Sequence, residues 1–322
     1  MTARRNVRAR LVAPRRFELA DRPVGRVREG GALVRILGCG VCASSLPLWE
    51  GRPWFDYPRP AGEPGHEGWG IVEAVAPDVT ELSPGDLVAT LGLDALAQYL
   101  VCPATECVRL PHRLAGRPFP GEALGCGFNV VRRAGLEPAQ RIAVVGGGFL
   151  GLLVGAIAHH LGAVVVVASR RAQARQLAEQ LGAAATIDSN DPETALARAR
   201  RLVPKGWDCV IECTGLQAPL DLASELVRER GRLVIAGYHQ DGRRQVDMQS
   251  WNWRGIDVVN AHERDPARYR QGIQEAARAA AEGWLRHEQL VSHSFPLEEV
   301  GAAFELVGRA PDGLTKAVLR MD

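Results

Sequence analysis

The chain has 322 residues, of which 46% are hydrophobic and 24% charged, a composition typical of a globular protein with more than one domain. Its net charge of +2 gives no electrostatic reason to expect a nucleic-acid or membrane partner, and its longest apolar run, 163–168, is too short to span a bilayer. Seven cysteines are few for a disulfide scaffold, and the start of the chain lacks the apolar core of a secretory signal. We therefore expect a cytoplasmic protein.

The first 120 or so residues contain short apolar-rich segments separated by turn signals such as Ser83-Pro84-Gly85. The basic segment Arg4 to Arg16 predicts a charged first strand, because apolar residues and a proline interrupt its arginines. Further strands are expected at Ala32–Leu37, Gly70–Val75 and Asp86–Thr90. A string of such segments predicts an all-β, barrel-like domain.

From about Phe128 the pattern changes to an alternation of strands and helices. Strands are predicted at Arg141–Val145, Val164–Ala168, Trp207–Glu212 and Arg232–Ala236, and helices from Leu150 through His160 and from Ala172 to Leu181. Continuous apolar strands separated by helices predict a parallel sheet that is covered on both faces. The tail from about Pro266 is mostly helical and ends in a strand, Leu314–Leu319, that could return to the first domain.

A glycine-rich motif joins the predicted strand Arg141–Val145 to the helix that follows it. Gly146, Gly148 and Gly151 have the G-x-G-x-x-G spacing, and Phe149 and Leu150 open the helix. The first glycine permits a tight turn, the second lets the backbone approach a pyrophosphate, and the third lets helix and strand pack closely. The helix N-terminus then stabilises the phosphate charge. The motif predicts a dinucleotide site; the alternative is a glycine-rich turn in another α/β fold.

The residues at the end of the second strand indicate which dinucleotide binds. NAD sites usually carry Asp or Glu there, whereas this chain has Ser169, Arg170 and Arg171. Arginines attract the 2′-phosphate of NADPH and can bind it through two hydrogen bonds. The segment therefore favours NADPH over NADH. The alternative is a solvated basic start to the next helix, although helix starts usually prefer acidic residues.

Three short motifs contain candidate metal ligands. Cys42 lies in Gly-Val-Cys-Ala-Ser-Ser, His66 in Gly-His-Glu-Gly and Cys126 in Gly-Cys-Gly-Phe. Two thiolates and an imidazole are good zinc ligands, and an open fourth position suits a catalytic ion. A buried cysteine is more often a small core residue, which is our interpretation for Cys209 and Cys213. Cys102 and Cys107 could form a metal pair, but no second pair accompanies them, so core packing is preferred. Cys39 and Cys42 form a C-x-x-C, but no βαβ unit surrounds it as a thioredoxin-like redox site would require.

Because of these motifs and the glycine turn, the chain resembles the medium-chain dehydrogenase/reductase superfamily over nearly its whole length. The resemblance implies an α/β fold with a GroES-like β-barrel catalytic domain at 1–127 and 263–322 and a Rossmann domain at 128–262. It also implies one zinc held by Cys42, His66 and Cys126, with Glu67 beside the metal. Ser44 would carry the proton away from the substrate oxygen.

The chain departs from the family in three places. The lobe with four closely spaced cysteines is absent, so at most one zinc per chain is expected. Ser45 replaces an aspartate that commonly orients the zinc histidine, a change that can weaken metal binding by about 10–100-fold. Pro47 stands near the place where some relatives extend the proton relay with a histidine.

The resemblance assigns further positions. Lys316 matches a basic residue that contacts the cofactor pyrophosphate in relatives; the alternative is a solvated lysine on an edge strand. Asn260 and His262 are expected at the nicotinamide end of the cleft. The strand near 256–259 resembles the family's dimer strand, so a homodimer is expected. Aromatic residues after the first ligand indicate an apolar substrate pocket or ordinary packing: Trp49, Trp54 and Phe55.

The sequence therefore predicts a zinc-dependent oxidoreductase that transfers hydride between NADP(H) and a secondary alcohol or polyol, or the corresponding ketone. One alternative is a zinc-free relative that reduces a quinone or enone, against which the three intact ligands argue. The other is a nucleotide-binding regulator or scaffold without catalysis, supported only by Ser45 and the missing relay histidine.

Overall fold

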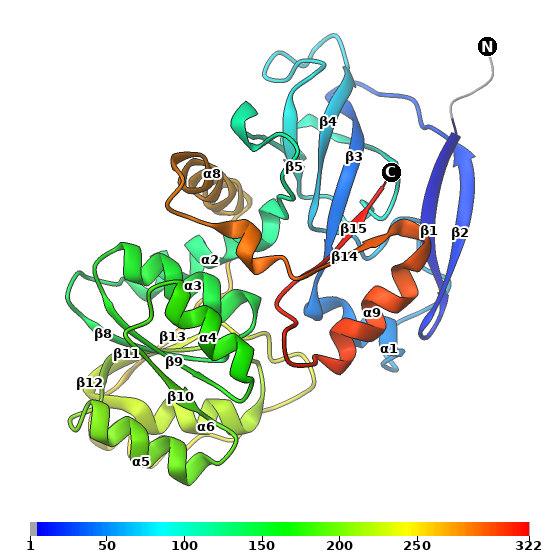
Figure 1. The fold of residues 1–322 in the computed structure, drawn as a ribbon. Helices are drawn as coiled ribbons and strands as arrows, with labels where there is room; N and C mark the ends of the chain where they lie inside the picture. The colour runs from blue at the N-terminus through cyan, green and yellow to red at the C-terminus, as the bar shows by residue number, and fades with distance from the viewer. Residues whose placement is uncertain (1–4, 322) are drawn as a thin grey trace. The chain divides into compact units, whose positions relative to one another are not determined.

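A computed structural model describes residues 5–321 and divides into two compact units (Figure 1). The first comprises the chain up to Gly125 and from Arg270 onward, and the second is Cys126–Tyr269. The predicted domains, 128–262 and 1–127 with 263–322, stay a prediction. No helix among the described residues is long and apolar enough to cross a membrane.

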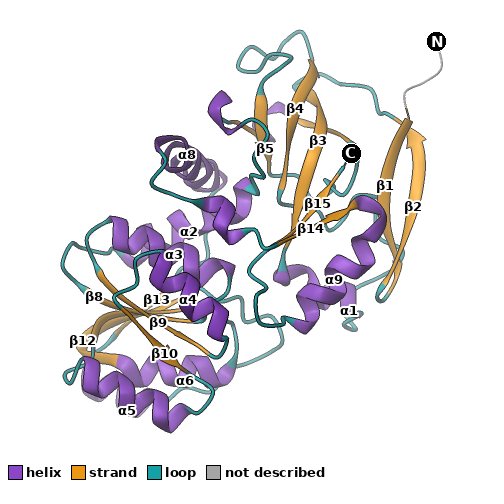
Figure 2. Ribbon diagram, viewed as in Figure 1, coloured by secondary structure: helices purple, strands orange, loops and turns teal. Residues whose placement is uncertain are grey.

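The first unit is built on a seven-stranded sheet and a separate two-stranded one. The order in the larger sheet is β14-β15-β3-β4-β5-β7, with β6 also paired to β3; Figure 2 shows β3, β4 and β5 side by side. β1 pairs antiparallel with β2, so a first strand is confirmed, but the predicted segment Arg4 to Arg16 is a strand only to Ala13 and then turns into β2; Arg4 lies outside the described residues. The strands are β1 Arg5–Ala13, β2 Arg16–Pro23, β3 Gly31–Val41, β4 Gly68–Val75, β5 Leu87–Thr90, β6 Tyr99–Pro103, β7 Cys107–Arg109, β14 His293–Pro296 and β15 Ala317–Arg320.

β3 is the central strand of this unit, and its composition explains why. Ala32, Val34 and Ile36 alternate along it and are at most 2% exposed, which is the period of a strand with one face in the core. β15 pairs antiparallel with the far end of β3, where Ala317 faces Val41. The predicted return of the last strand to the first part of the chain is thereby confirmed, and it brings Lys316 beside the end of β3.

Four helices accompany these strands: α1 Leu46–Glu50, α2 Gly121–Ala134, α8 Pro266–Glu282 and α9 Val300–Arg309. α2 and α8 each cross the boundary between the two units. α9 buries Ala303 and Phe304 against the core of the first unit, and Trp49 of α1 packs on the Phe304 ring at 6.1 Å. Ordinary packing is therefore the correct interpretation for Trp49, whereas Trp54 is 58% exposed.

The second unit is a six-stranded parallel sheet in the order β10-β9-β8-β11-β12-β13. Its strands are β8 Arg141–Val145, β9 Val164–Ser169, β10 Ala185–Asp188, β11 Trp207–Glu212, β12 Val227–Ile235 and β13 Asp257–Asn260. Its helices are α3 Phe149–His160, α4 Ala172–Gln180, α5 Pro192–Leu202, α6 Gln217–Leu226 and α7 Met248–Arg254. α5 and α6 cover one face and α3 and α4 the other (Figure 1). The predicted fold class is confirmed.

The strand order places a topological switch point between β8 and β11. β8 begins the half that runs outward through β9 to β10, and β11 begins the half that runs outward through β12 to β13. In open α/β sheets, ligands bind at the carboxyl ends of the strands beside such a point. The loops that follow β8 and β11 are therefore the expected edge of a ligand site in this unit.

Candidate metal and cofactor sites

Two neighbouring strands bring the predicted first and second metal ligands together. Cys42 directly follows β3, and His66 lies just before β4, which pairs with β3. One ligand atom from each of Cys42, His66 and Glu67 lies within 4.8 Å of the other two. Thiolate, imidazole and carboxylate are the ligand types that zinc takes in proteins, so this cluster fits the predicted ion.

The imidazole of His66 is oriented by the backbone. Its Nδ1 lies 3.1 Å from the Pro64 carbonyl oxygen, which can only accept a hydrogen bond. Nδ1 therefore carries the proton, and Nε2 is left to ligate a metal, as in most zinc–histidine sites. Ser45 is buried, and its amide donates to the Cys42 carbonyl at 3.0 Å. The Pro64 carbonyl thus supplies the orientation that the missing aspartate was expected to provide.

The pKa of the His66 imidazole depends on Cys42. Burial lowers the pKa of His66, but the hydrogen bond to Cys42 and the negative charge of its thiolate outweigh burial and raise that pKa to about 10. Zinc takes neutral imidazole as a ligand, so a raised pKa of His66 makes metal binding dependent on pH.

Ser44 lies in a 3₁₀ turn, Ala43–Ser45, immediately after the first ligand. Its hydroxyl donates to Cys42 Sγ at 3.2 Å and is half-buried. A donor at a thiolate stabilises the charged form. The predicted role of Ser44 in moving a proton from the substrate oxygen stays a prediction.

Glu67, a member of this cluster, forms a buried ion pair that was not predicted from the sequence. Lys316 Nζ lies 2.7 and 2.9 Å from the two carboxylate oxygens of Glu67, and these residues are 5% and 0% exposed. Gly40 makes the room, because a Cβ at that position would lie 1.8 Å from Glu67 Oε2. Burial lowers the pKa of Lys316, but Glu67 and Cys42 raise it above its ordinary value, so the amine stays charged.

This pair corrects one interpretation of Lys316. A solvated lysine on an edge strand is wrong, because the side chain is buried against Glu67 just before β15. The predicted contact of Lys316 with a cofactor pyrophosphate stays a prediction. Cys126 lies in α2 as the first residue of the second unit and is half-buried; its role as third ligand also stays a prediction.

In the second unit, the predicted strand–turn–helix is confirmed at the switch point. Gly146 follows β8 with a φ of +116°, and Gly148 is the N-cap of α3, which begins at Phe149 and continues through Leu150. A Cβ at Gly151 would lie 1.8 Å from the Gly146 carbonyl oxygen, so only glycine allows α3 to start this close to the turn. The N-cap residue Gly148 has no side chain that could cap α3, and a helix N-terminus that follows such a turn suits an anion.

The basic segment after β9 has a defined structure. Ser169 is buried, and its hydroxyl accepts from the Arg171 amide at 3.2 Å. Arg171 Nη2 donates to the Gly147 carbonyl at 2.9 Å, which ties this segment to the glycine turn. Arg170 is exposed. Of the predicted pair of arginines, Arg171 shapes the turn and Arg170 presents its guanidinium outward.

Arg175, on α4, is a member of this segment that sequence reasoning missed. Its Nη1 donates to the carbonyls of Ser169 and Arg170 at 2.7 and 3.0 Å, and its Nη2 lies 3.0 Å from Asp188 at the end of β10. The signal was available, because position i+4 from Arg171 lies on the same face of a helix. Arg175 thereby fixes the backbone from which Arg170 projects.

Four of the remaining cysteines pack in the cores, as predicted: Cys39, Cys102, Cys107 and Cys209 are at most 6% exposed. Cys213 is half-buried, and burial raises the pKa of its thiol. Cys102 Sγ lies 3.6 Å from Cys107 Sγ. No third ligand of a metal site joins Cys102 and Cys107 among residues 5–321.

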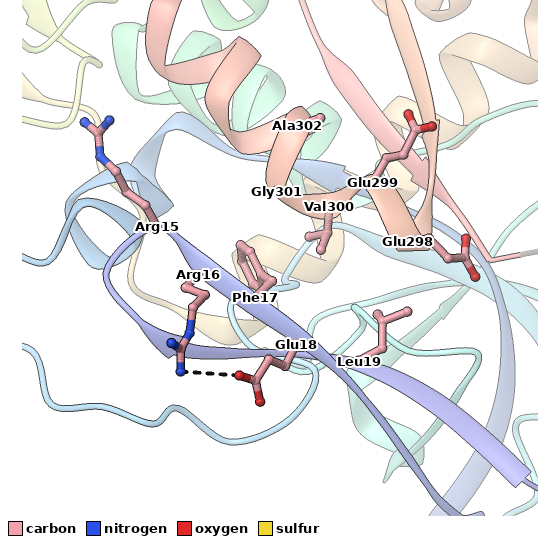
Figure 3. A pocket seen from close by; sticks show the side chains of 10 residues that line it. All are labelled: Arg15, Arg16, Phe17, Glu18, Leu19, Glu298, Glu299, Val300, Gly301 and Ala302. Carbon is pink, nitrogen blue, oxygen red and sulfur yellow. Dashed lines mark ion pairs between the residues drawn. The ribbon is translucent and has the colours of Figure 1, made fainter.

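A surface groove of about 350 Å³ lies between β2 and the start of α9 (Figure 3). Its two arginines are paired: Arg16 lies 3.3 Å from Glu18, and Arg15 lies 3.9 Å from Glu305. None of the predicted site residues lines it. The lining residues are Arg15, Arg16, Phe17, Glu18, Leu19, Glu298, Glu299, Val300, Gly301 and Ala302.

Known proteins resemble this chain in sequence and in fold. The alcohol dehydrogenase GroES-like domain matches residues 28–112, and the zinc-binding dehydrogenase family matches residues 150–278. Sorbitol dehydrogenase of Gallus gallus is 29% identical, over 95% of this chain and 94% of that protein. The 2-dehydro-3-deoxy-L-galactonate 5-dehydrogenase of Pseudoalteromonas atlantica is 24% identical, over 87% and 88%.

The alcohol dehydrogenase TADH from Thermus sp. ATN1 has the same fold, with a TM-score of 0.84 and 25% identity over 98% of this chain and 100% of that one. The two matched families together cover more than half of the chain, and the dehydrogenase relatives match it nearly end to end. The chain therefore belongs to the zinc-dependent medium-chain dehydrogenase/reductase superfamily and is an oxidoreductase.

Proposed function

We propose that this protein uses one catalytic zinc to interconvert a secondary alcohol or polyol with its ketone, with hydride passing to or from NADP(H). The observation that carries the proposal is the approach of Cys42, His66 and Glu67 ligand atoms to within 4.8 Å. The dehydrogenase relatives, among them the sorbitol dehydrogenase, support an alcohol or polyol substrate.

In this proposal Cys42, His66 and Cys126 hold the zinc. When bound, zinc acts as a Lewis acid that lowers the pKa of the substrate hydroxyl. The Pro64 carbonyl keeps Nε2 of His66 available. Ser44 would relay the proton of the substrate hydroxyl, taking it up as its own hydroxyl proton passes to solvent. Lys316 forms an ion pair with Glu67, which fixes the position of this carboxylate beside the ligands.

The preference for NADPH rests on the segment after β9. No carboxylate ends β9, and the exposed guanidinium of Arg170 projects from a backbone that Arg175 fixes. Arg170→Ala is expected to weaken NADPH binding by about 10–100-fold, the value of a charge-assisted contact to phosphate, and to leave NADH binding within about twofold. Arg198→Ala, which removes an exposed arginine on α5, is the matched control.

Fluorescence titration of each protein with both dinucleotides provides the measurement. Equal weakening of NADPH and NADH in Arg170→Ala would show that Arg170 does not select the 2′-phosphate. An NADPH affinity below that for NADH in the wild type would contradict the preference itself.

We also propose a homodimer in which β13 meets the same strand of a second copy. β13 is an edge strand of the sheet, and Val258 on it is 41% exposed. Trp253, on the neighbouring helix α7, is 89% exposed, and large aromatic side chains of this kind commonly anchor interfaces.

Trp253→Ala is expected to raise the dimer dissociation constant by at least about tenfold, the effect of losing a central aromatic anchor. Sedimentation velocity over a concentration series measures it. Trp54→Ala, which removes the 58% exposed tryptophan of the first unit, is the control and should leave the constant unchanged. A monomeric wild type at micromolar concentration would contradict the proposed assembly.

A further inference from the structure

A buried carboxylate stands at the carboxyl end of β11, beside the switch point. Glu212 is 0% exposed, and its Oε1 accepts from the Thr214 amide at 2.5 Å, from the Gly215 amide at 2.9 Å and from the Thr214 hydroxyl. Its Oε2 lies 3.1 Å from His239 Nε2. The loop after β11 therefore supplies the donors to one oxygen, and His239 approaches the other from the loop after β12.

The partners of His239 define its tautomer. Arg244 Nε lies 2.8 Å from Nδ1, and a guanidinium nitrogen can only donate, so Nδ1 accepts. Nε2 consequently carries the proton that it donates to Glu212. Arg244 continues the chain of contacts by donating from Nη2 to the Gly215 carbonyl at 2.6 Å and to Asp241. His239 is thus a two-sided link between a buried carboxylate and an arginine.

This network locks two loops together. A Cβ at Gly237 would lie 2.2 Å from the Gly215 amide nitrogen and 2.6 Å from Glu212 Oε2, so the loop after β12 seats directly on the loop after β11. Tyr238 stacks on His262, in the loop after β13, with ring centroids 5.7 Å apart and planes at 9°. The loops that follow β11, β12 and β13 are therefore joined to one another.

The same network touches the glycine turn. A Cβ at Gly146 would lie 2.7 Å from Thr214 Cγ2, so the loop that Glu212 organises packs against the turn after β8. In a doubly wound sheet, the half beginning at the first strand takes the adenosine and the other half takes the second nucleotide. β11 and β12 belong to that second half, which would face the nicotinamide nucleotide.

We propose that His239 is a positioning residue: by linking Glu212 to Arg244, it holds the 236–246 loop in the shape that receives the nicotinamide half of the dinucleotide. The proposal rests on the proposed function, because it requires a dinucleotide at the switch point. Without the link, the loop populates other shapes, and the apparent affinity falls by the fraction of molecules that remain competent.

His239→Phe removes both hydrogen bonds and keeps a ring of similar size. His239→Gln offers a donor and an acceptor on one amide, and Arg244→Gln removes the guanidinium from the other side of the link. Arg243→Gln, at the exposed neighbour of Arg244 in the same loop, is the matched control. The probes are NADPH and NADH, together with 2′,5′-ADP and ADP, which carry only the adenine half.

Calorimetric titrations should show NADPH binding weakened about tenfold in His239→Phe and Arg244→Gln, partly restored in His239→Gln and unchanged in Arg243→Gln. Binding of 2′,5′-ADP should stay within about twofold of wild type in all four variants, because its site lies on the other half of the sheet. KM for the dinucleotide should rise with kcat nearly unchanged at saturation, and thermal unfolding of each variant verifies that it is folded.

Unchanged NADPH binding in folded His239→Phe and Arg244→Gln would overturn the proposal, and so would equal weakening of NADPH and 2′,5′-ADP. A wild type that binds neither dinucleotide but is folded would overturn the proposed function as well. The two failures are thus told apart by the wild-type titration.

Discussion

Replacing Cys42 by serine is expected to give a folded protein that holds no zinc and oxidises or reduces its substrate at least about a thousandfold more slowly. The magnitude corresponds to the several kcal/mol of transition-state stabilisation that a Lewis-acidic metal provides. Cys42 is expected to be decisive because its sulfur serves three groups at once: it would ligate the metal, it accepts from Ser44 and it sets the charge of His66. Elemental analysis and steady-state kinetics on the same preparation measure both effects.

The control for this variant is Cys209→Ala, which removes a buried thiol of β11 and should keep both zinc and turnover. Retention of stoichiometric zinc in Cys42→Ser would contradict the predicted ligand set. Loss of zinc with full activity would favour the zinc-free reductase that the sequence left open as an alternative.

Lys316→Met is expected to lower the free energy of unfolding by about 3–5 kcal/mol, because it leaves the Glu67 carboxylate buried and unpaired. Both side chains are buried, so solvent screens their interaction very little. The double variant Glu67→Gln/Lys316→Met removes both charges and should recover most of this loss. Urea unfolding at neutral pH gives the three free energies.

The pH dependence follows from the raised pKa of Lys316. A cation whose folded-state pKa is raised contributes stability that is fully present below its ordinary value of 10.5 and is lost as the pH rises through the folded-state value. The difference between wild type and Lys316→Met should therefore be constant across neutral pH and shrink only in strong alkali. A loss below about 1 kcal/mol in Lys316→Met would show that the pair contributes no more than a surface ion pair.

The sequence predicted best the strands that have an apolar interior. Arg141–Val145 and Trp207–Glu212 begin and end in the structure at the predicted residues, because a strand buried on both faces needs a run of apolar residues in its middle. β6 and β7 are short strands whose pairing partners are distant in sequence, and no periodic pattern can develop over so few residues. The β1–β2 hairpin was seen only as a single charged strand, because most of β2 is exposed and carries no apolar alternation.

The residues of the candidate site also differ in whether local sequence patterns could predict them. Short sequence motifs were enough to find Cys42, His66 and the Gly146 turn, because backbone requirements constrain the residues next to each functional side chain. The pairing of Glu67 with Lys316 joins positions 249 residues apart, and the link from Glu212 to His239 depends on how two strand ends meet. Such contacts follow from the order of strands in a sheet, which single-residue patterns do not contain.

Turnover by this protein is expected to depend on a single zinc held at Cys42 and His66. The most direct measurement follows NADPH consumption with a panel of ketones while a chelator removes metal from the wild-type protein, with zinc per chain determined at each point. We expect one zinc per chain, activity that falls in proportion to the zinc removed, and recovery when zinc is returned. Full activity in a protein freed of zinc, or no turnover of any ketone in the panel by a protein with one zinc per chain, would contradict the proposed function.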